Sequence, residues 1–314
     1  MFGRALARRG IALMHVYLPV AAMDVNLVWV ACAGIGVGVV QGLLGSGGFL
    51  LTPLLIMLGV TPAVATASGI NAIVGASVSG TLTHLRVGNV DVRMGSLMLA
   101  GGVSGGALGT SIVKALRAVG NLDVVILSCY VIFMTLIGVM VFVEGLTSQV
   151  RGGSKGTRTS GVQRLLQRLP LQMRFTVSGI ETSMLAPFLL GAFVGILAAI
   201  MGVGGGFILI PAMTYLLGMP MQVVVGTSLF QMLFTSSSVT LLQAAMNHTV
   251  DVVLASILLV GSALGAQLGA RLGQHLRAHQ LKVVFSLLVL GMSLKMLNGL
   301  FAAPESLFRQ LVSR

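Results

Sequence analysis

Two clusters of glycine stand inside apolar sequence, and they are the residues whose type and spacing most suggest chemistry. Residues 42–53 read GLLGSGGFLLTP, and residues 199–211 read AIMGVGGGFILIP. Each glycine costs about 1 kcal/mol relative to alanine inside a helix, so several together let the chain leave helical geometry. A helix that restarts after such a break presents unpaired N–H groups and the positive end of its dipole, which attract anions. The pattern predicts half-helices that begin at Phe49 and Phe207 and hold one small anion between their amino ends.

Small polar side chains downstream of each cluster could complete an anion site. Ser68 and Asn71 lie three positions apart, as do Ser228 and Gln231, so hydroxyl and amide share one face of a helix. Neutral donors of this kind can coordinate the oxygens of an anion without a charged side chain. The substrate-binding residues that we expect are Gly45, Ser46, Gly47, Gly48, Ser68, Asn71, Gly204, Gly205, Gly206, Thr227, Ser228 and Gln231. Weaker candidates of the same kind are Gln41, Ser79, Thr81, Thr83, Thr235 and Ser236. The structural alternatives are close packing of helices at the glycines and ordinary hydrogen bonds between helices.

An enzyme is poorly supported by the same residues. Ser46 lies between glycines, but Gly-Ser-Gly-Gly is neither the GxSxG elbow of a hydrolase nor a P-loop, which requires GK[ST]. A membrane hydrolase that pairs Ser46 with His84 is conceivable, yet the second cluster reads GVGGG, with Val203 after its first glycine and no serine. We therefore expect no enzyme.

Metal, cofactor and proton-relay sites are not indicated either. The acidic residues lie at or near the ends of apolar segments, where Asp91 and Asp251 follow turn-like residues and are expected to cap helices. Cys32 and Cys129 fall inside apolar segments, without the spacing of metal ligands or of a disulfide framework. We expect no metal, no cofactor and packing roles for both cysteines.

The elements that position these residues are expected to be helices that span a lipid bilayer. The chain has 314 residues, of which 56% are hydrophobic and 8% charged, whereas a soluble domain carries roughly 25% charged residues. Apolar stretches recur near the roughly 20 residues that a helix needs to cross hydrocarbon, and barrel-type strands are absent. The net charge of +12 does not indicate nucleic acid, because the basic residues cluster at the ends of apolar runs, as in cytoplasmic loops. The expected fold class is an all-α integral membrane protein, a polytopic helical bundle.

The bundle is expected to consist of two homologous repeats. Gly48 and Pro53 match Gly206 and Pro211, and further along Ser68 matches Ser228. Expected helical segments are 27–44, 48–58, 62–85, 92–115 and 122–144 in the first copy, and 184–202, 206–217, 220–246, 251–274 and 281–302 in the second. The segments after the glycines are too short to span, so we expect about eight spanning helices plus two glycine-broken or re-entrant half-helices. Close helix packing is expected at the glycines with four-residue spacing, which are Gly101, Gly105, Gly109, Gly261, Gly265 and Gly269.

The chain divides into five parts around these repeats. They are an amino-terminal cytoplasmic or interfacial segment (1–26), repeat one (27–145), a basic polar linker (146–183), repeat two (184–302) and a tail (303–314). Residues 161–175 of the linker could form a basic amphipathic helix or a solvated connector. Counting Lys and Arg favours an arrangement with the amino terminus, linker and tail all cytoplasmic. If each short arm folds back fully, the repeats instead become inverted, and the sequence leaves this choice open.

The two glycine clusters, the FLLTP and FILIP that follow them, and the downstream TASGIN and GTSLFQ together resemble the TauE/SafE family of sulfite and organosulfonate exporters. The resemblance covers about residues 27–302. It implies a multi-pass permease of the bacterial inner membrane that exports small sulfur-containing anions such as sulfite or sulfoacetate. We expect alternating access around a midplane site between the broken helices. The alternative is a membrane scaffold or accessory subunit that binds partners through the basic linker. A homodimer is one expectation for the oligomeric state.

Overall fold

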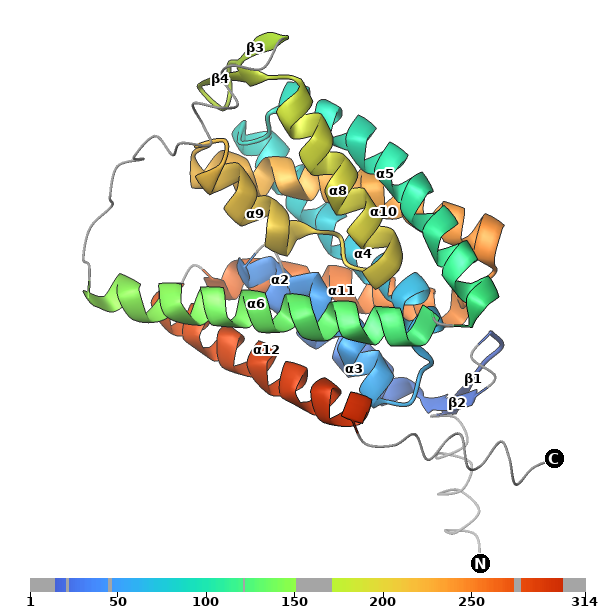
Figure 1. The fold of residues 1–314 in the computed structure, drawn as a ribbon. Helices are drawn as coiled ribbons and strands as arrows, with labels where there is room; N and C mark the ends of the chain where they lie inside the picture. The colour runs from blue at the N-terminus through green and yellow to red at the C-terminus, as the bar shows by residue number, and fades with distance from the viewer. Residues whose placement is uncertain are drawn as a thin grey trace, which may run out of the picture.

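The computed structural model describes residues 15–20, 23–44, 47–120, 122–150, 171–273 and 278–301. In the first half, a hairpin of β1 (His15–Leu18) and β2 (Met23–Asn26) precedes α2 (Leu27–Leu44), the 3-10 turn η1 (Gly47–Leu50), α3 (Leu51–Met57), α4 (Pro62–Val87), α5 (Val92–Val119) and α6 (Leu122–Val150). In the second half, a hairpin of β3 (Gln172–Phe175) and β4 (Ile180–Ser183) precedes α8 (Leu185–Met201), α9 (Gly206–Tyr215), α10 (Met221–Asn247), α11 (Val252–Gly273) and α12 (Ala278–Phe301). Figure 1 shows these elements as one helical bundle with a small hairpin at either end.

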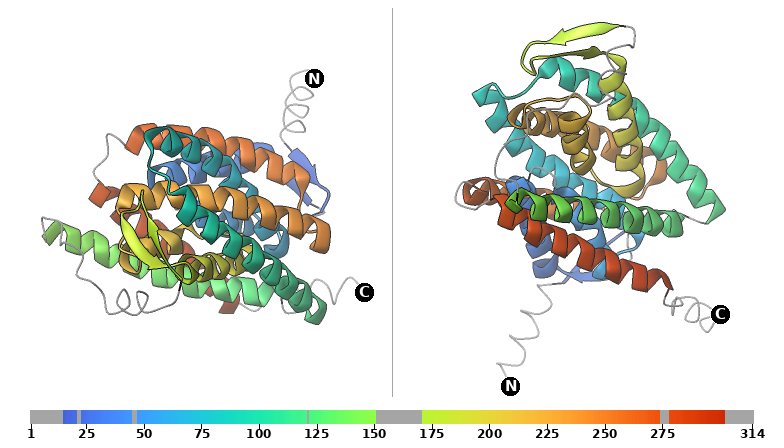
Figure 2. Two further views of the ribbon diagram at one scale, coloured as in Figure 1. Left: turned by 90° about the horizontal axis from the view of Figure 1, so that it is seen from above. Right: turned by 60° about the vertical axis from the view of Figure 1, so that its left-hand side comes forward.

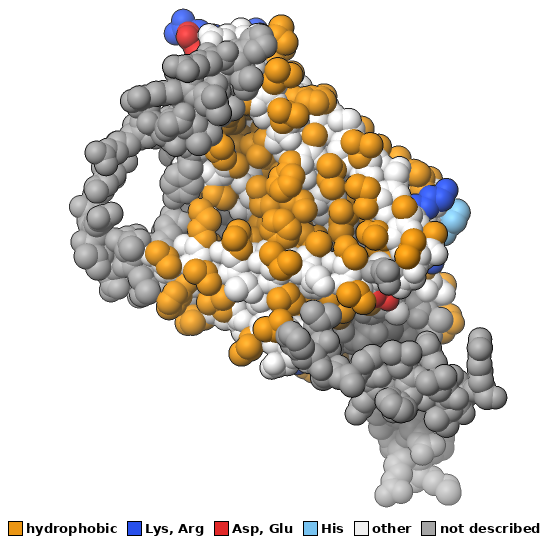
Figure 3. Space-filling view, in the orientation of Figure 1, with side chains coloured by type: hydrophobic (Ala, Val, Ile, Leu, Met, Phe, Trp, Pro, Cys, Tyr) orange, Lys and Arg blue, Asp and Glu red, His pale blue; other side chains and the backbone are white. Residues whose placement is uncertain are grey.

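The all-α membrane class is confirmed. Five helices within the described residues are long and apolar enough to cross a membrane, namely α4, α5, α10, and the Leu122–Val143 and Val252–Gly269 parts of α6 and α11. The segments Leu27–Leu43, Gly48–Met57 and Leu185–Met201 are apolar but shorter. Large hydrophobic side chains such as Leu136, Leu241 and Val252 are exposed, as a bilayer requires of a bundle surface. Figure 3 shows such side chains covering one face, while the coloured charges lie at its edges.

Every helical segment expected from the sequence overlaps a helix, with ends that differ by at most six residues, although the segment expected at 48–58 begins as the 3-10 turn η1. The helix ends have local causes. α5 begins at Asp91, whose Oδ1 accepts the N–H of Met94 at 3.1 Å, and it ends at Gly120 in the left-handed conformation. Asp251 caps α11 in the same way, because its Oδ1 accepts the N–H of Leu254. Both expected caps are therefore confirmed.

The four-residue glycine pattern produces close contact between helices of different halves. A β-carbon on Gly105 of α5 would lie 2.0 Å from the carbonyl oxygen of Ala192 in α8. A β-carbon on Gly265 of α11 would lie 2.1 Å from the carbonyl oxygen of Ile35 in α2. Only glycine permits backbones to approach so closely, so packing is confirmed as the role of these positions. Gly261 is looser, with its nearest neighbour at 3.3 Å.

The helices α4 and α10, which match by sequence, run in opposite directions. Gly80 of α4 faces Leu229 of α10, and Gly226 of α10 faces His84 of α4, so residue numbers rise along one helix as they fall along the other. The two hairpins accordingly lie at opposite ends of the bundle, β3–β4 at the top of Figure 1 and β1–β2 at its lower right; the right-hand view of Figure 2 agrees. Neither hairpin was predicted from the sequence. The possible amphipathic helix at 161–175 falls largely outside the described residues, and its end belongs to β3.

Candidate functional site

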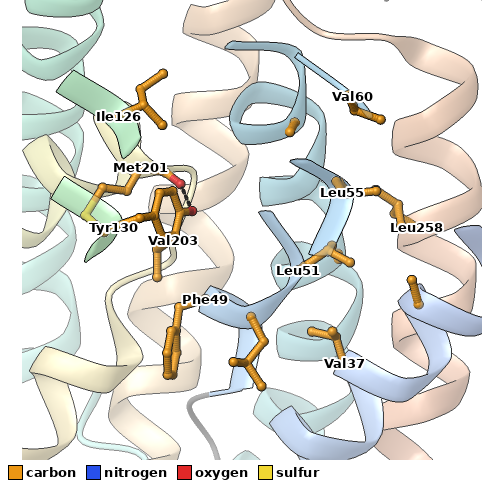
Figure 4. Packing of buried hydrophobic residues seen from close by; sticks show 14 of the residues in the cluster. Val37, Phe49, Leu51, Leu55, Val60, Ile126, Tyr130, Met201, Val203 and Leu258 are labelled. Carbon is orange, nitrogen blue, oxygen red and sulfur yellow. Dashed lines mark hydrogen bonds between the residues drawn. The ribbon is translucent and has the colours of Figure 1, made fainter. Parts of the chain in front are cut away.

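The two glycine breaks meet in the interior of the bundle. The rings of Phe49, in η1, and Phe207, in the first turn of α9, have centroids 5.2 Å apart. Both side chains are buried, and Phe133 of α6 packs edge-on against Phe207. Figure 4 shows Phe49 beside Val203, with Tyr130 of α6 above them. Tyr130 donates a hydrogen bond to the carbonyl of Met201, the last residue of α8, and so holds the chain where it leaves the helix.

Ile73 of α4 lies between the two breaks and is completely buried. A β-carbon on Gly48 would lie 2.6 Å from its Cγ1, and a β-carbon on Gly204 would lie 2.6 Å from its Cγ2. One side chain therefore contacts both glycine segments, which come from halves of the chain that are far apart in sequence. Any larger residue at either glycine would collide with it.

The second break requires glycine for backbone reasons as well. α8 ends at Gly202 with φ 66°, and α9 begins after Gly205 with φ 75°, both in the left-handed region. The carbonyl of Gly205 accepts the N–H groups of Ile208 and Leu209, which closes the first turn of α9. No side chain caps this turn, so the N–H groups of Gly206 and Phe207 point out of the helix end, where an anion could bind.

The first break is built differently. Gly45 and Ser46 lie outside the described residues, while Gly47 and Gly48 open the 3-10 turn η1, which is followed by only seven residues of α3. So short a helix has few aligned peptide dipoles and a weak positive end. Of the two breaks, only the second is therefore followed by a longer half-helix, α9.

Two polar side chains flank the breaks without hydrogen-bond partners. Gln41 of α2 places Oε1 3.1 Å from the β-carbon position of Gly48, and Ser236 of α10 places Oγ 3.2 Å from that of Gly204. Gln41 is 2% exposed and Ser236 0%. Within the described part of the chain, both side-chain atoms of Gln41 and the hydroxyl of Ser236 lack a partner. Buried polar groups are almost always paired, and an unpaired one costs about 1–3 kcal/mol, so these atoms call for a bound ligand or water.

Neighbouring hydroxyls show that this lack of partners is selective. Ser237 and Ser238 of α10 donate to the carbonyls of Leu233 and Phe234, one turn earlier in the same helix. Serine and threonine inside helices commonly bond in this way. Ser236 and Thr240, one turn apart on the buried face, do not. On α4, Thr83 bonds the carbonyl of Ser79, whereas Ser77 and Thr81, on the face that begins at Ile73, have no partner among the described residues. Unpaired hydroxyls thus lie on one face of α4 and on one face of α10.

Two of the polar residues expected from matching positions in the two copies join the halves of the chain. Ser68 accepts the N–H of Asp251 at 2.8 Å, and Thr227 accepts the N–H of Asp91 at 3.0 Å, so each joins the start of a helix in the other half.

The remaining three side chains bond within their own helices. The amide of Asn71 donates to the carbonyl of Ser68, and the hydroxyl of Ser228 donates to that of Val225. Gln231 donates to Thr235 and faces Gly102 of α5, although its Oε1 is unpaired.

Gln41 and Ser236 were only weaker candidates in the sequence, and Ile73 was not considered. The duplication drew attention to polar residues present in both copies, whereas Gln41 matches Ala199 and Ser236 matches Ala76. The available signal was position on a helix, because Ser236 and Thr240 share one face with Gln243 and Asn247.

A group of three or more His, Cys, Asp or Glu that could hold a metal does not occur among the described residues.

Comparison with known proteins identifies the family. Residues 30–296 match the model of the family described as "Sulfite exporter TauE/SafE". Among curated proteins, the "Probable membrane transporter protein YjnA" of Bacillus subtilis (strain 168) is 24% identical over 268 residues, which cover 84% of this chain and 97% of that protein. A "Probable membrane transporter protein" of Xylella fastidiosa (strain 9a5c) is 28% identical over 263 residues, or 82% and 90% of the two chains. No solved structure matches. Because the family match covers most of the chain, the protein belongs to the TauE/SafE sulfite exporter family and is a multi-pass membrane transporter, not an enzyme.

Proposed function

We propose that this transporter is a permease for small sulfur-containing anions, such as sulfite, sulfoacetate or related organosulfonates, and that it exports them across the bacterial inner membrane. The observation that carries the proposal is the meeting of the two glycine breaks at Ile73, with Gln41 and Ser236 unpaired beside them. The amino end of α9 supplies backbone N–H groups and a positive dipole end, and Ser236 supplies a hydroxyl donor.

The binding site that follows is neutral apart from the substrate. Gly204, Gly205 and Gly206 hold the anion through backbone groups, and Gly47 and Gly48 leave room for it on the opposite side. Gly45 and Ser46 stay predictions, because they lie outside the described residues. Neutral donors suit a transporter, since a fixed lysine or arginine would bind the anion tightly and slow its release.

We further propose that the halves are inverted repeats, each with three spanning helices and a re-entrant pair, α2 with α3 and α8 with α9. The antiparallel packing of α4 against α10 supports this arrangement. Inverted repeats put the two hairpins at opposite membrane faces. This differs from the arrangement that counting Lys and Arg favoured, in which the amino terminus and the linker lie on the same side. Arg86, Arg93 and Arg271 lie at the linker's end of the bundle, so the positive-inside rule favours a cytoplasmic linker. Rocking of the two halves about Ile73 would alternate access.

The test is flux with purified protein in liposomes, across a panel of sulfite, sulfate, thiosulfate, sulfoacetate and acetate. We expect saturable transport of sulfur oxyanions, which is abolished in Gly204→Leu but kept in Gly291→Leu, a control with nothing within 4 Å of its β-carbon position. Preference for carboxylates or cations would contradict the proposal. Light scattering of the same sample tests the expected homodimer. The scaffold alternative concerns residues 151–170, outside the described part of the chain; flux that survives their deletion would count against it.

A further inference from the structure

One face of α10 carries a polar row from the glycine break to the end of the helix. Its members are Ser236, Thr240, Gln243 and Asn247, spaced by four, three and four positions, which keeps them on one helix face. Ser236, Gln243 and Asn247 are at most 5% exposed. The hydroxyls of Ser236 and Thr240 and the Oδ1 of Asn247 have no partner within the described residues. Such a row is costly inside a packed helix interface unless water or a polar substrate visits it.

The amides of the row connect its outer end to the break. Gln243 donates to the carbonyl of Ala199, in the last turn of α8, at 2.8 Å. Asn247 donates to Oε1 of Gln243 at 2.6 Å. These two hydrogen bonds connect the end of α10 with the last turn of α8, and the four residues of the row are called the polar track below.

An exposed cation stands at the outer end of this track. Nη1 of Arg117, from the last turn of α5, donates to the carbonyl of Asn247, the last residue of α10. The guanidinium has five N–H donors, so this one bond leaves others for an anion. A simpler role for Arg117 is to stabilise the carboxyl end of α10, whose carbonyls attract cations.

The four residues of the track are not repeated at the matching positions of the other half. The positions of α4 that match its four residues are Ala76, Gly80, Thr83 and Val87, of which only Thr83 is polar. Thr83 is exposed and bonds its own helix. Helix packing in a duplicated protein would call for similar residues in both copies, so the difference indicates a function specific to this end of the bundle.

We propose that the polar face of α10 is the route between the anion site and this end of the bundle, and that Arg117 is the substrate's first contact there. The inference rests on the proposed transport of small anions. Arg117 concentrates the anion at the mouth, and N–H and hydroxyl donors of Gln243 and Thr240 replace part of its hydration shell on the way to Ser236.

The test compares Arg117→Gln with Lys114→Gln in liposome flux. The protein is oriented so that the end of the bundle that carries Arg117 faces the solution to which the anion is added. Lys114 is exposed on the same helix, three positions before Arg117. Its replacement by glutamine removes the same charge as Arg117→Gln. We expect Arg117→Gln to raise KM about tenfold at low ionic strength and less at high salt, with kcat nearly unchanged, because charge at a mouth acts on capture. Arg117→Lys should restore most of the loss, and Lys114→Gln should behave as wild type. Equal KM values for the two Gln variants, or a fall in kcat and melting temperature without a KM change, would overturn the proposal.

Thr240→Val provides a second, independent test of the proposed route. Valine has the shape of threonine without its hydroxyl, so a purely structural Thr240 would leave the protein as stable or more stable and flux unchanged. The proposed track predicts unchanged folding with kcat/KM reduced about fivefold or more, while Ser238→Ala has no effect. Unchanged flux in Thr240→Val would refute the track even where wild type transports anions. Failure of wild type to transport any anion would refute the proposed function itself.

Discussion

Asp91 and Ser178 are 87 residues apart in the chain, yet Oδ2 of Asp91 accepts both the N–H and the hydroxyl of Ser178, at 3.0 and 2.6 Å. Ser178 lies in the turn between β3 and β4, so a hairpin of the second half closes over the start of α5 in the first. The matching contact occurs at the other end, where Oδ2 of Asp251 accepts the N–H of Val20, in the turn between β1 and β2. Each hairpin thus fastens the other half, which gives the short strands a structural purpose.

Replacing Asp91 by alanine should destabilise the bundle. The change removes a helix cap and two hydrogen bonds to a buried carboxylate, which together are worth about 2–4 kcal/mol, or roughly 5–10 °C in apparent melting temperature. Asp251→Ala should have a similar effect, because it removes the matching contact. The measurement is thermal unfolding of detergent-purified protein followed by intrinsic fluorescence or size-exclusion loss.

The matched control is Asp123→Ala, at an exposed carboxylate in the first turn of α6. It should shift the melting temperature by about 2 °C or less, since an exposed helix-end charge contributes about 0.3–1 kcal/mol. Equal melting temperatures for Asp91→Ala and Asp123→Ala would mean that the hairpin contact adds nothing to stability.

Ser236 and Ser237 offer a comparison of two adjacent serines in one helix. Ser237 bonds its own backbone, whereas Ser236 faces Gly204 without a partner. Ser236→Ala should leave stability unchanged or slightly higher, since it removes an unpaired buried hydroxyl, and should reduce anion flux about tenfold by removing a substrate donor. Ser237→Ala should leave flux unchanged. Liposome flux and melting temperature are measured on both variants; equal flux would remove Ser236 from the site.

The helices, their ends and their glycine contacts were predictable from the sequence, because each depends on local pattern. Apolar length identified the spans, Asp91 was identified as a cap by its position, and four-residue spacing identified the Gly105 contact. The anion-site residues were harder, because Ser68 and Thr227 are polar, duplicated and yet committed to joining the halves. Whether a hydroxyl bonds its own helix or remains unpaired depends on its neighbours in space, which the sequence does not contain.

Whether the short segments 48–58 and 206–217 cross the membrane or fold back could not be predicted from the sequence for a similar reason. Counting basic residues assumes that each apolar segment carries the chain across the membrane, so a pair that returns to its own side reverses every later loop. The antiparallel contact of Gly80 with Leu229 and of Gly226 with His84 is a tertiary fact. The hairpins were missed because strands of four residues have too little periodicity to stand out beside long apolar runs.

Gly204→Ala should reduce transport, because the added methyl group collides with Ile73, and a second substitution at Ile73 should relieve the collision. The new β-carbon would lie 2.6 Å from Cγ2 of Ile73, and Ile73 cannot retreat because its Cγ1 already reaches the first break at Gly48. We expect flux to fall by at least tenfold. Adding Ile73→Ala removes the clashing methyl and should restore part of the flux, although that change alone costs about 2–5 kcal/mol of stability. Flux that stays low in the double variant, with the protein folded, would show that Ile73 is not the obstacle.

Gly105→Ala and Gly36→Ala apply one substitution at two glycines with opposite surroundings. A β-carbon on Gly105 would lie 2.0 Å from the carbonyl oxygen of Ala192, whereas Gly36 of α2 has nothing within 4 Å. Because the clash is with backbone, α5 and α8 must separate, at a cost of about 1–3 kcal/mol or more. At Gly36, alanine should be neutral or stabilise the helix by up to about 1 kcal/mol. Melting temperatures measured side by side should therefore move in opposite directions, or fall only for Gly105→Ala; equal shifts would mean that α5 and α8 can part without cost.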